Sequence, residues 1–293
     1  MTRSGFVALA GRPNVGKSTL VNAIVGSKVA IVSDRPQTTR RAIRGVATTD
    51  EWQLVLVDLP GVQRPRDALT TRMQRRVERE LADCDVALLV VDAATGIGPG
   101  DRFIARLLAG SSVPVVTAVN KVDRLDRGRT VLALAAAAEL DAGEEIFPVS
   151  ARTGAGVDAL VSHLAGLLTP GPFLFEPGQP SDQPRERLLG ELIREQVLRR
   201  TFQEVPHAVE VMVEAVEARS PDLTDIDAVI WVETESQRGI LIGSGGSMIK
   251  AIGSAARPEL ERELGTRVHL ELSVRLRRRW RADEALLDRL GIE

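Results

Sequence analysis

The sequence contains no tyrosine, one cysteine and three histidines among 293 residues, and aromatic residues make up 3% of it. The single cysteine, Cys84, excludes an intrachain disulfide and suits a reducing compartment. The three histidines lack the spacing of metal ligands, so we expect no histidine metal site. With so few aromatic side chains, any recognition of nucleic acid must use little base stacking.

Long apolar runs are also missing. The run from Val86 to Val91 suits a buried strand and is too short for a membrane span. The first residues lack the apolar core of a secretory signal, so we expect a cytoplasmic protein. A net charge of -2, 44% apolar and 27% charged residues are ordinary for a globular protein, and the length accommodates about two domains.

A phosphate-binding pattern begins ten residues into the chain. Gly11 to Ser18 reads GRPNVGKS, which matches G-x-x-x-x-G-K-[ST], and it lies between a short apolar run and residues at helical spacing. In such loops glycines let backbone N–H groups turn towards phosphate oxygens, and the helix N-terminus adds positive charge. Lys17 would contact the terminal phosphates and Ser18 would bind Mg²⁺. The pattern alone predicts a nucleoside triphosphate and leaves ATP and GTP open.

Strand-like and helix-like segments alternate from Gly5 to about Leu168. Strands are expected at Phe6–Ala10, Ala42–Thr48, Leu54–Asp58, Val86–Asp92, Val115–Asn120 and Ile146–Ser150, and helices at Lys17–Val25, Leu69–Ala82, Asp101–Ala109, Arg129–Leu140 and Val157–Leu168. The second strand would pair with the third through a hairpin. This alternation predicts an α/β P-loop domain over residues 1–168, with a mostly parallel sheet covered by helices on both faces.

The tetrapeptide NKVD at residues 120–123 selects the base. It comes at the end of an expected strand, where sheets of this type bind ligands. The Asp123 carboxylate can accept two hydrogen bonds from the N1 and 2-amino groups of guanine, a pair that adenine does not offer. Asn120 and Lys121 would line and cover the ring, and residues 150–152 (Ser-Ala-Arg) would present N–H groups to the base oxygen. These residues predict GTP.

A second set of residues is expected around the γ-phosphate. Asp58, in the sequence DLPG, would hold Mg²⁺ directly or through water. Gly61 would offer its N–H to the γ-phosphate and act as a pivot when that phosphate leaves. The polar segment 33–41 contains Thr38 and Thr39, either of which could complete the metal shell while the γ-phosphate is present; we favour Thr39.

Residues 169–184 mark a domain boundary, since TPGPFLFEPGQPSDQP holds five prolines and two glycines. The apolar Phe173–Phe175 predicts that part of this linker docks on a domain. An amphipathic helix is expected at Glu186–Phe202, strands at Ala208–Ala218 and Ile226–Ser236, a helix near Met248–Leu264 and a last strand at Arg267–Leu276. This order predicts a smaller α+β domain over residues 185–293.

A glycine loop in the second half predicts contact with RNA. Residues 243–246 read GSGG and match the G-x-x-G pattern that clamps a nucleic-acid backbone. We expect the loop to follow a strand whose apolar lead-in is Gly239–Ile242, and to precede a helix that carries Lys250. The densest basic run of the chain spans Arg275 to Arg281. In a chain of net charge -2, this run indicates contacts with RNA phosphates.

These motifs resemble those of the Era family of bacterial GTPases. In the first half the resemblance rests on GRPNVGKSTLVNAIVG, IVSDRPQTTR, VDLPG, NKVD and SA. In the second half VETESQRGILIGSGGSMIKAIG and LELSVRLRRRWR are similar to the family's type II KH domain and its C-terminal tail. The resemblance covers nearly the whole chain.

The resemblance implies a Ras-like GTP domain and a KH domain that binds the 3′ region of small-subunit ribosomal RNA and assists assembly of the small ribosomal subunit. Val62 stands where Ras-like switches have a catalytic glutamine, so GTP hydrolysis should be slow. Asn14 is similar to the asparagine of potassium-using relatives, which leaves K⁺ open as a second cation. Two residues depart from the family pattern: Leu59 replaces a threonine, and Ser244 replaces a common lysine.

The predicted sites are as follows. GTP or GDP would contact Gly11, Arg12, Pro13, Asn14, Val15, Gly16, Lys17, Ser18, Thr19, Asp58, Leu59, Pro60, Gly61, Val62, Asn120, Lys121, Val122, Asp123, Ser150, Ala151 and Arg152. Transition-state and switch roles fall to Lys17, Thr39 and Gly61, and Mg²⁺ to Ser18, Thr39 and Asp58. RNA would contact Gly243, Ser244, Gly245, Gly246, Lys250, Arg275, Arg277, Arg278 and Arg279.

We expect a monomer whose partner is ribosomal RNA. Two other classes stay open from the residues. One is a signalling switch that uses the C-terminal domain as an adaptor for a protein. The other is a GTPase held peripherally at the inner face of the cell membrane by its arginine run, and it ranks last because the sequence has no clear lipid anchor.

Overall fold

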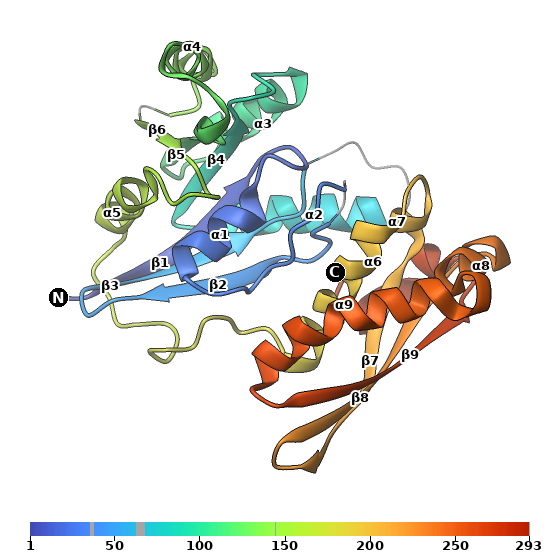
Figure 1. Cartoon of the computed structure of the whole chain (residues 1–293). Coiled ribbons are helices and arrows are strands. Elements are labelled where there is room, and N and C mark those ends of the chain that lie inside the picture. The colour runs from blue at the N-terminus through green and yellow to red at the C-terminus, as the bar shows by residue number, and fades with distance from the viewer. Residues whose placement is uncertain (36–37, 63–67, 144, 293) are drawn as a thin grey trace. The chain divides into compact units, whose positions relative to one another are not determined.

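The computed structural model describes residues 1–35, 38–62, 68–143 and 145–292, and the chain divides into two compact units (Figure 1). The first unit contains Met1–Ala30, Thr39–Asp182 and Gly291–Glu293, and the second contains Ile31–Thr38 and Gln183–Leu290. None of the described helices combines the length and the apolar character that crossing a membrane requires.

The first unit is an α/β domain built on a six-stranded sheet with the order β2-β3-β1-β4-β5-β6. Its elements are β1 (Arg3–Ala10), α1 (Lys17–Val25), β2 (Ile43–Thr48), β3 (Trp52–Asp58), α2 (Ala68–Asp83), β4 (Val86–Asp92), α3 (Pro99–Ala109), β5 (Val115–Asn120), α4 (Arg127–Ala138), β6 (Glu145–Val149) and α5 (Val157–Leu167). Only β2 is antiparallel to its neighbour in this sheet, and it pairs with β3 through the expected hairpin. The predicted fold class and element order are confirmed.

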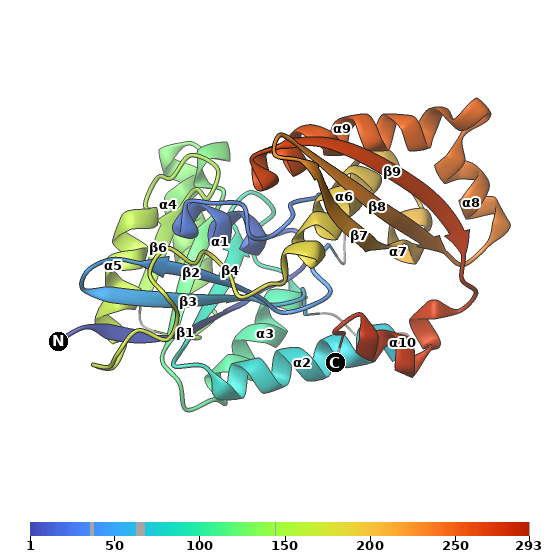
Figure 2. The ribbon, with the colours of Figure 1, turned by 90° about the horizontal axis from the view of Figure 1, so that it is seen from below.

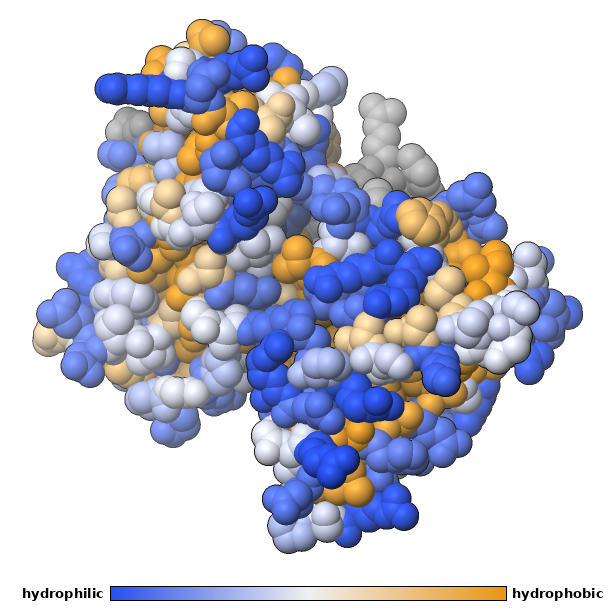
Figure 3. Space-filling view, viewed as in Figure 1, coloured by the Kyte–Doolittle hydropathy of each residue, from blue (hydrophilic) through white to orange (hydrophobic). Residues whose placement is uncertain are grey.

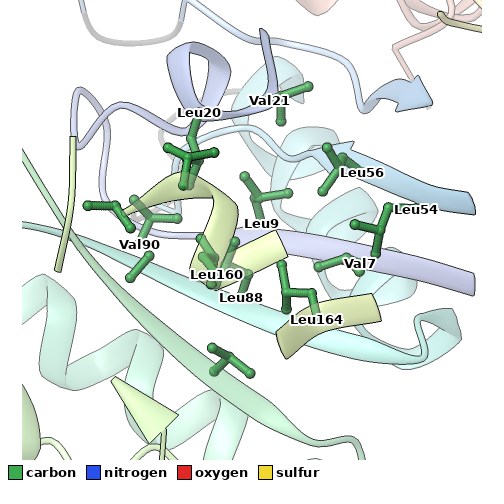
Figure 4. Packing of buried hydrophobic residues seen from close by; sticks show 14 of the residues in the cluster. Val7, Leu9, Leu20, Val21, Leu54, Leu56, Leu88, Val90, Leu160 and Leu164 are labelled. Carbon is green, nitrogen blue, oxygen red and sulfur yellow. The ribbon is translucent and has the colours of Figure 1, made fainter. Parts of the chain in front are cut away.

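Each face of this sheet packs against its own set of helices. On one face, Val7 and Leu9 of β1 lie among buried residues of α1 and α5, including Leu20 and Leu160 (Figure 4). On the other face, the alternate β1 residue Ala8 lies in a cluster with residues of α2, α3 and α4. The strand ends that carry the predicted site are thereby fixed between two apolar layers.

The proline-rich segment belongs to the first unit as far as Asp182. The Gln53 side chain on β3 accepts hydrogen bonds from the N–H groups of Leu174 and Phe175, at 2.7 and 2.9 Å. Farther along, the N–H of Val46 on β2 donates to the Pro180 carbonyl at 2.8 Å. The expectation that this apolar stretch docks on a domain is therefore correct.

The second unit has a three-stranded sheet with the order β7-β8-β9, and α6 and α9 pack side by side on it (Figure 2). Its elements are α6 (Arg185–Arg200), α7 (Val205–Ala208), β7 (Glu210–Ser220), β8 (Leu223–Val232), α8 (Glu235–Ile242), α9 (Ser247–Leu264), β9 (Arg267–Leu276) and α10 (Glu284–Arg289). The strand β8 is antiparallel to β7 and parallel to β9. The parallel pair requires the crossover that α8 and α9 provide.

Two local expectations for this unit are wrong. Gly239–Ile242 is the end of helix α8 and not a strand lead-in, because Thr234 and Gln237 form a capping box that starts a helix there. Helix α6 is also not a simple amphipathic helix, since all ten residues from Leu189 to Leu198 are buried, including Glu191, Arg194 and Glu195. The sequence pattern shows which residues are apolar but not that charged ones are buried with them.

The basic C-terminal stretch is folded. After β9 the chain forms a 3₁₀ turn at Trp280–Ala282 and then α10. The Trp280 side chain is fully buried, and its indole N–H donates to the Ala208 carbonyl at 2.8 Å. This tryptophan therefore anchors the arginines that precede it.

Candidate nucleotide and nucleic-acid sites

The phosphate-binding loop lies between β1 and α1, as predicted. Its conformation needs Gly16, which has φ 99° and whose missing Cβ would lie 2.3 Å from the Nδ2 atom of Asn120. Asn14 also has a left-handed φ, of 66°. Gly11 lies against β4, where a Cβ would come within 2.5 Å of the Val90 carbonyl oxygen. The loop is thus held close to two strands of the sheet.

Lys17 is buried, and its ammonium group is held by the loop itself. Its Nζ donates to the carbonyl oxygens of Gly11 and Arg12, at 3.1 and 3.3 Å. Burial lowers the pKa of Lys17, while the charge of Asp58 acts in the opposite direction. A phosphate would supply the strong partner that two neutral carbonyls do not, so this lysine suits a polyanionic ligand.

The three residues predicted to bind Mg²⁺ meet at one place. Ser18 Oγ donates to Asp58 Oδ2 at 2.6 Å, Thr39 Oγ1 donates to the same oxygen at 3.2 Å, and the two hydroxyls are 3.1 Å apart. The other carboxylate oxygen of Asp58 is buried with no hydrogen-bond partner among the described residues. Burial raises the pKa of Asp58, against the smaller effects of Lys17, Ser18 and Thr39. Two hydroxyls and one underused carboxylate form an oxygen donor set that fits Mg²⁺.

The DLPG segment approaches the phosphate loop. The Val62 N–H donates to the Gly11 carbonyl at 3.3 Å, and a Cβ on Gly61 would lie 2.8 Å from the Pro13 ring. Val62 is buried, as is Leu59, which packs in the apolar cluster beneath the sheet. The Leu59 departure therefore lies in the core. The segment that follows, residues 63–67, lies outside the described residues.

Asn120, which we predicted to line the base, also joins three segments of the site. The residue is 1% exposed. Its Nδ2 donates to the Val15 carbonyl at 2.9 Å, and its Oδ1 accepts from the N–H groups of Lys121 and Ala151, at 2.8 and 3.0 Å. The asparagine thereby fixes the phosphate loop to both segments of the predicted base site.

The Asp123 carboxylate contacts Ser150, another residue of the predicted base site. Its Oδ1 accepts from Ser150 Oγ at 2.7 Å, which fixes the orientation of the carboxylate. The guanidinium of Arg152 is 3.9 Å from Oδ2, and the arginine side chain is 77% exposed. Such a loosely held carboxylate oxygen leaves hydrogen-bonding capacity for guanine.

Two further residues support the loop without having been predicted. The Lys121 ammonium donates to the Asn14 carbonyl at 2.6 Å and to Asp92 Oδ2 at 2.7 Å, so Asp92 at the end of β4 orients the lysine that would cover the base. Arg12 pairs at 2.8 Å with Asp101, which is fully buried at the start of α3. The only sequence signal for Asp92 is that an aspartate directly follows an apolar run. Nothing in the spacing of the sequence indicates that Asp101 pairs with Arg12.

The G-x-x-G loop connects α8 to α9. Gly243, Gly245 and Gly246 have φ values of 73°, 57° and 80°, and a Cβ on Gly243 would lie 2.7 Å from the Met248 nitrogen. Ser244 and Lys250 are exposed. The face that carries α8 and α9 is mostly hydrophilic, with small apolar groups scattered over it (Figure 3). The N–H groups of Gly243 and Gly246 bond to the Gly239 and Gly243 carbonyl oxygens, at 2.9 and 3.2 Å, so a phosphate at the start of α9 would meet the N–H groups of Ser244 and Gly245.

The predicted RNA-binding arginines differ in their surroundings. Arg275 forms two hydrogen bonds with the Glu214 carboxylate, at 2.6 and 3.0 Å. Arg277 lies over the Trp231 ring, with its guanidinium carbon 4.7 Å from the ring centroid. Arg278 and Arg279 are exposed, and neither has an ion pair with another described residue. The last two therefore contribute the least neutralised positive charge of the run.

Comparison with known proteins covers both units. A family model described as a 50S ribosome-binding GTPase matches residues 6–121, and a KH domain model matches residues 204–281. GTPase Era of Mycobacterium sp. (strain KMS) is 45% identical over 294 residues, which cover 99% of this chain and 98% of the relative. GTPase Era of Mycobacterium tuberculosis (strain ATCC 25177 / H37Ra) is also 45% identical and covers 98% of both chains.

Two solved structures are similar over the whole chain. A crystal structure of Era in complex with MgGDPNP and nucleotides 1506–1542 of 16S ribosomal RNA has a TM-score of 0.95 and 34% identity, covering 100% of this chain and 99% of that one. A variant of Aquifex aeolicus Era bound to GDP·AlF₄⁻ has a TM-score of 0.93 and 33% identity, covering 99% of both chains.

Proposed function

The chain belongs to the Era family of GTPases, and we propose that it hydrolyses GTP slowly and binds the 3′ region of small-subunit ribosomal RNA under control of the bound nucleotide. In this role it assists assembly of the small ribosomal subunit. It acts as a monomer in the cytoplasm. The solved complex of Era with an analogue of GTP and a segment of 16S ribosomal RNA supports the pairing of these two ligands.

The observation that best supports binding of GTP with Mg²⁺ is that Ser18, Thr39 and Asp58 lie together. They come from α1, from the segment before β2 and from β3, yet their oxygens lie 2.6 to 3.2 Å apart. With GTP bound, Mg²⁺ would be held by these oxygens and would neutralise charge that develops on the phosphates. Lys17 would bind the terminal phosphates, and the Gly61 N–H would donate to the γ-phosphate.

Slow hydrolysis follows from Val62. An isopropyl group cannot accept or donate a hydrogen bond, so it cannot orient an attacking water as a glutamine would. The positive charge needed in the transition state then comes from Lys17 and Mg²⁺, with K⁺ near Asn14 as an additional source. GTP therefore stays bound long enough for the GTP-bound protein to differ from the GDP-bound protein in its RNA binding.

The RNA part rests on the glycine loop and the exposed arginines of the second unit. The backbone N–H groups of Ser244 and Gly245 would bind phosphates, while Arg278 and Arg279 would add charge along the RNA strand. Aromatic stacking has little place here, because Trp231 lies under Arg277 and Trp280 is buried. Recognition would use base edges and backbone shape instead.

Equilibrium binding of an RNA that ends in the 3′ region of the small-subunit ribosomal RNA tests the proposal. We expect the RNA to bind about tenfold more tightly with a non-hydrolysable GTP analogue than with GDP, the size typical of coupling between two sites. Equal affinities would overturn the control by nucleotide. Failure to bind RNA, with retention on a protein partner or on anionic vesicles, would favour the signalling or the membrane alternative.

A further inference from the structure

The side chain of Arg12 connects the phosphate loop to the start of helix α3. Its Nη2 donates to the Gly96 carbonyl oxygen at 3.0 Å, and its Nε lies 2.8 Å from Asp101 Oδ2. Gly96 lies between β4 and α3, and Asp101 lies in the first turn of α3. These residues all belong to the first unit. The guanidinium therefore joins two segments of one domain that are far apart in the chain.

Residues 96–100 are shaped to receive this arginine. A Cβ on Gly100 would lie 2.7 Å from Arg12 Cδ, and a Cβ on Gly98 would lie 3.5 Å from Arg12 Nη1. Gly96, whose carbonyl oxygen accepts from Arg12, has a left-handed φ of 71°. At Gly100 a larger residue would have to displace the arginine, because the two chains are already in contact there.

Asp101 depends on Arg12 for a counter-charge. The aspartate is 0% exposed, its Oδ2 accepts from the Gly98 N–H at 2.8 Å, and its Oδ1 is buried with no hydrogen-bond partner among the described residues. A buried carboxylate is costly unless a cation lies beside it, and the start of a helix supplies only a partial positive charge. Arg12 supplies the cation, so its guanidinium is held where Asp101 requires it.

The backbone of Arg12 in turn contacts the lysine of the loop. Lys17 Nζ donates to the carbonyl oxygens of Gly11 and Arg12, at 3.1 and 3.3 Å. Because the Arg12 side chain is fixed at its far end, its backbone and this carbonyl oxygen have little freedom to move. The second half of the loop is held separately, by Asn120 and Lys121. The carboxylate of α3 therefore restrains the half of the loop that carries both acceptors of Lys17.

We propose that Asp101 is a positioning residue for phosphate binding. Through Arg12, it holds the first half of the phosphate loop where the Lys17 ammonium faces the terminal phosphates of GTP and GDP. Helix α3, which contains none of the predicted nucleotide contacts, thereby sets how tightly these phosphates are bound. The inference rests on the proposed function in one respect, the contact of Lys17 with the phosphates.

Two variants of the full-length protein test the inference in different ways. Asp101→Asn removes the charge that holds Arg12, whereas Gly100→Ala leaves every charge in place and puts a methyl group where Arg12 Cδ lies. We expect each variant to weaken GDP and GTP binding equally, by about tenfold, because Lys17 contacts phosphates that both nucleotides carry. Fluorescence titration with labelled GDP and GTP measures the two affinities.

A double-mutant cycle with Lys17→Ala distinguishes positioning from a general loss of structure. Asp101→Asn should cause no further loss of GDP affinity when Lys17 has already been replaced, because Asp101 acts through Lys17. A variant that only loosens the fold would lose affinity to the same extent in both backgrounds, and this result would overturn the inference. If Asp101→Asn does not fold, Gly100→Ala takes its place in the cycle.

Helix α5 offers two matched controls, Asp158→Asn and Gly166→Ala. Asp158 also lies in the first turn of a helix but is exposed, and a Cβ on Gly166 meets nothing within 4 Å. Both controls should leave the affinities for GDP and GTP unchanged. Losses as large as those of Asp101→Asn and Gly100→Ala would show that the contact with Arg12 is irrelevant, and would overturn the inference.

Failure of the proposed function is recognised separately in the same cycle. If Lys17→Ala by itself leaves GDP and GTP affinity unchanged, the phosphate site is wrongly assigned and both ideas fall. If Lys17→Ala has its effect while Asp101→Asn and Gly100→Ala have none, only the inference about Asp101 falls.

Discussion

The predicted nucleotide site and the predicted RNA surface are built in opposite ways. In the first, Lys17, Asp58 and Asn120 are buried, and each is hydrogen-bonded to another part of the same site. In the second, Ser244 and Arg278 are exposed. Single changes in the buried network leave a polar group without its partner, which is costly. Changes on the exposed surface remove one charge among several and should act by small increments.

The largest effect is expected at Asp123, whose carboxylate would hold guanine. Asp123→Asn replaces an acceptor by a donor that faces the N1 and 2-amino groups, so GTP affinity should fall about 1,000-fold. Xanthine presents an oxygen at the 2-position, so XTP should bind more tightly than GTP to this variant. Competition between the two nucleotides measures the exchange. Asp126→Asn, which changes the cap of α4 and an ion pair with Arg129 on that helix, is the control. Unchanged GTP preference in Asp123→Asn would contradict the base site.

The next effect is expected from Gly16→Ala. The substitution strains a left-handed φ and drives a methyl group into the Asn120 side chain, so GTP and GDP affinity should both fall about 100-fold. Gly26→Ala is a matched control, because Gly26 also has a left-handed φ, of 75°, but a Cβ there meets nothing within 4 Å. Fluorescence titration with labelled GDP distinguishes them. Equal losses in both variants would show that backbone strain, and not the Asn120 tether, matters.

A smaller and graded effect is expected from pH. Burial raises the pKa of Asp58, so the carboxyl keeps its proton at pH values where an exposed aspartate has lost it. Mg²⁺ binds only the ionised carboxylate, so metal binding must release that proton. The apparent Mg²⁺ affinity should therefore fall about tenfold per pH unit below the raised pKa and level off above it. Titration of Mg²⁺ at several pH values measures this, and Asp58→Asn should give a weak, flat profile.

The contrast between the two regions also explains what the sequence could reveal. The loop from Gly11 to Ser18 and the NKVD tetrapeptide are short, contiguous and conformationally demanding, so their residue types follow directly from geometry. Ser18, Thr39 and Asp58 lie in three separate segments that reach the same edge of the sheet. Ser18 follows the end of β1, Asp58 ends β3, and Thr39 precedes the antiparallel strand β2. The tethering role of Asn120 was not predictable, since it depends on the Val15 carbonyl of another loop.

The errors of prediction lie mainly in the second unit. Gly239–Ile242 is short and apolar, and such a run does not distinguish a strand from the end of a helix. The capping pair Thr234 and Gln237 was the available signal for α8. For α6, the sequence shows apolar residues at helical spacing, but burial of Arg194 depends on partners such as Thr38, which is 156 residues away in the chain. The spacing of neighbouring residues does not indicate which polar groups, far away in the chain, a charged side chain will contact.

On the RNA surface, Arg278 and Arg275 should differ. Arg278→Ala should weaken binding of the 3′-region RNA about fivefold and reduce the slope of affinity against salt by about one. Arg275→Ala should have less effect, because Glu214 already neutralises that side chain. Binding isotherms at several salt concentrations measure both quantities. Equal effects would show that RNA displaces Glu214 from Arg275, and Glu214→Gln would then strengthen binding.

The smallest effect is expected from Ser244, where the family commonly has lysine. Ser244 is exposed between two glycines of the loop, so Ser244→Lys adds a charge without disturbing packing. RNA affinity should rise about threefold at low salt, and the gain should shrink as salt increases because it comes from counterion release. Ser236→Lys, on the exposed first turn of α8, tests whether charge anywhere nearby suffices. If both substitutions act equally, the loop is no more than part of a general positive surface. A gain in RNA affinity confined to Ser244→Lys would place an RNA phosphate at the loop. GTP affinity should be unchanged, because a single exposed charge on the RNA surface does not alter the buried polar network of the nucleotide site.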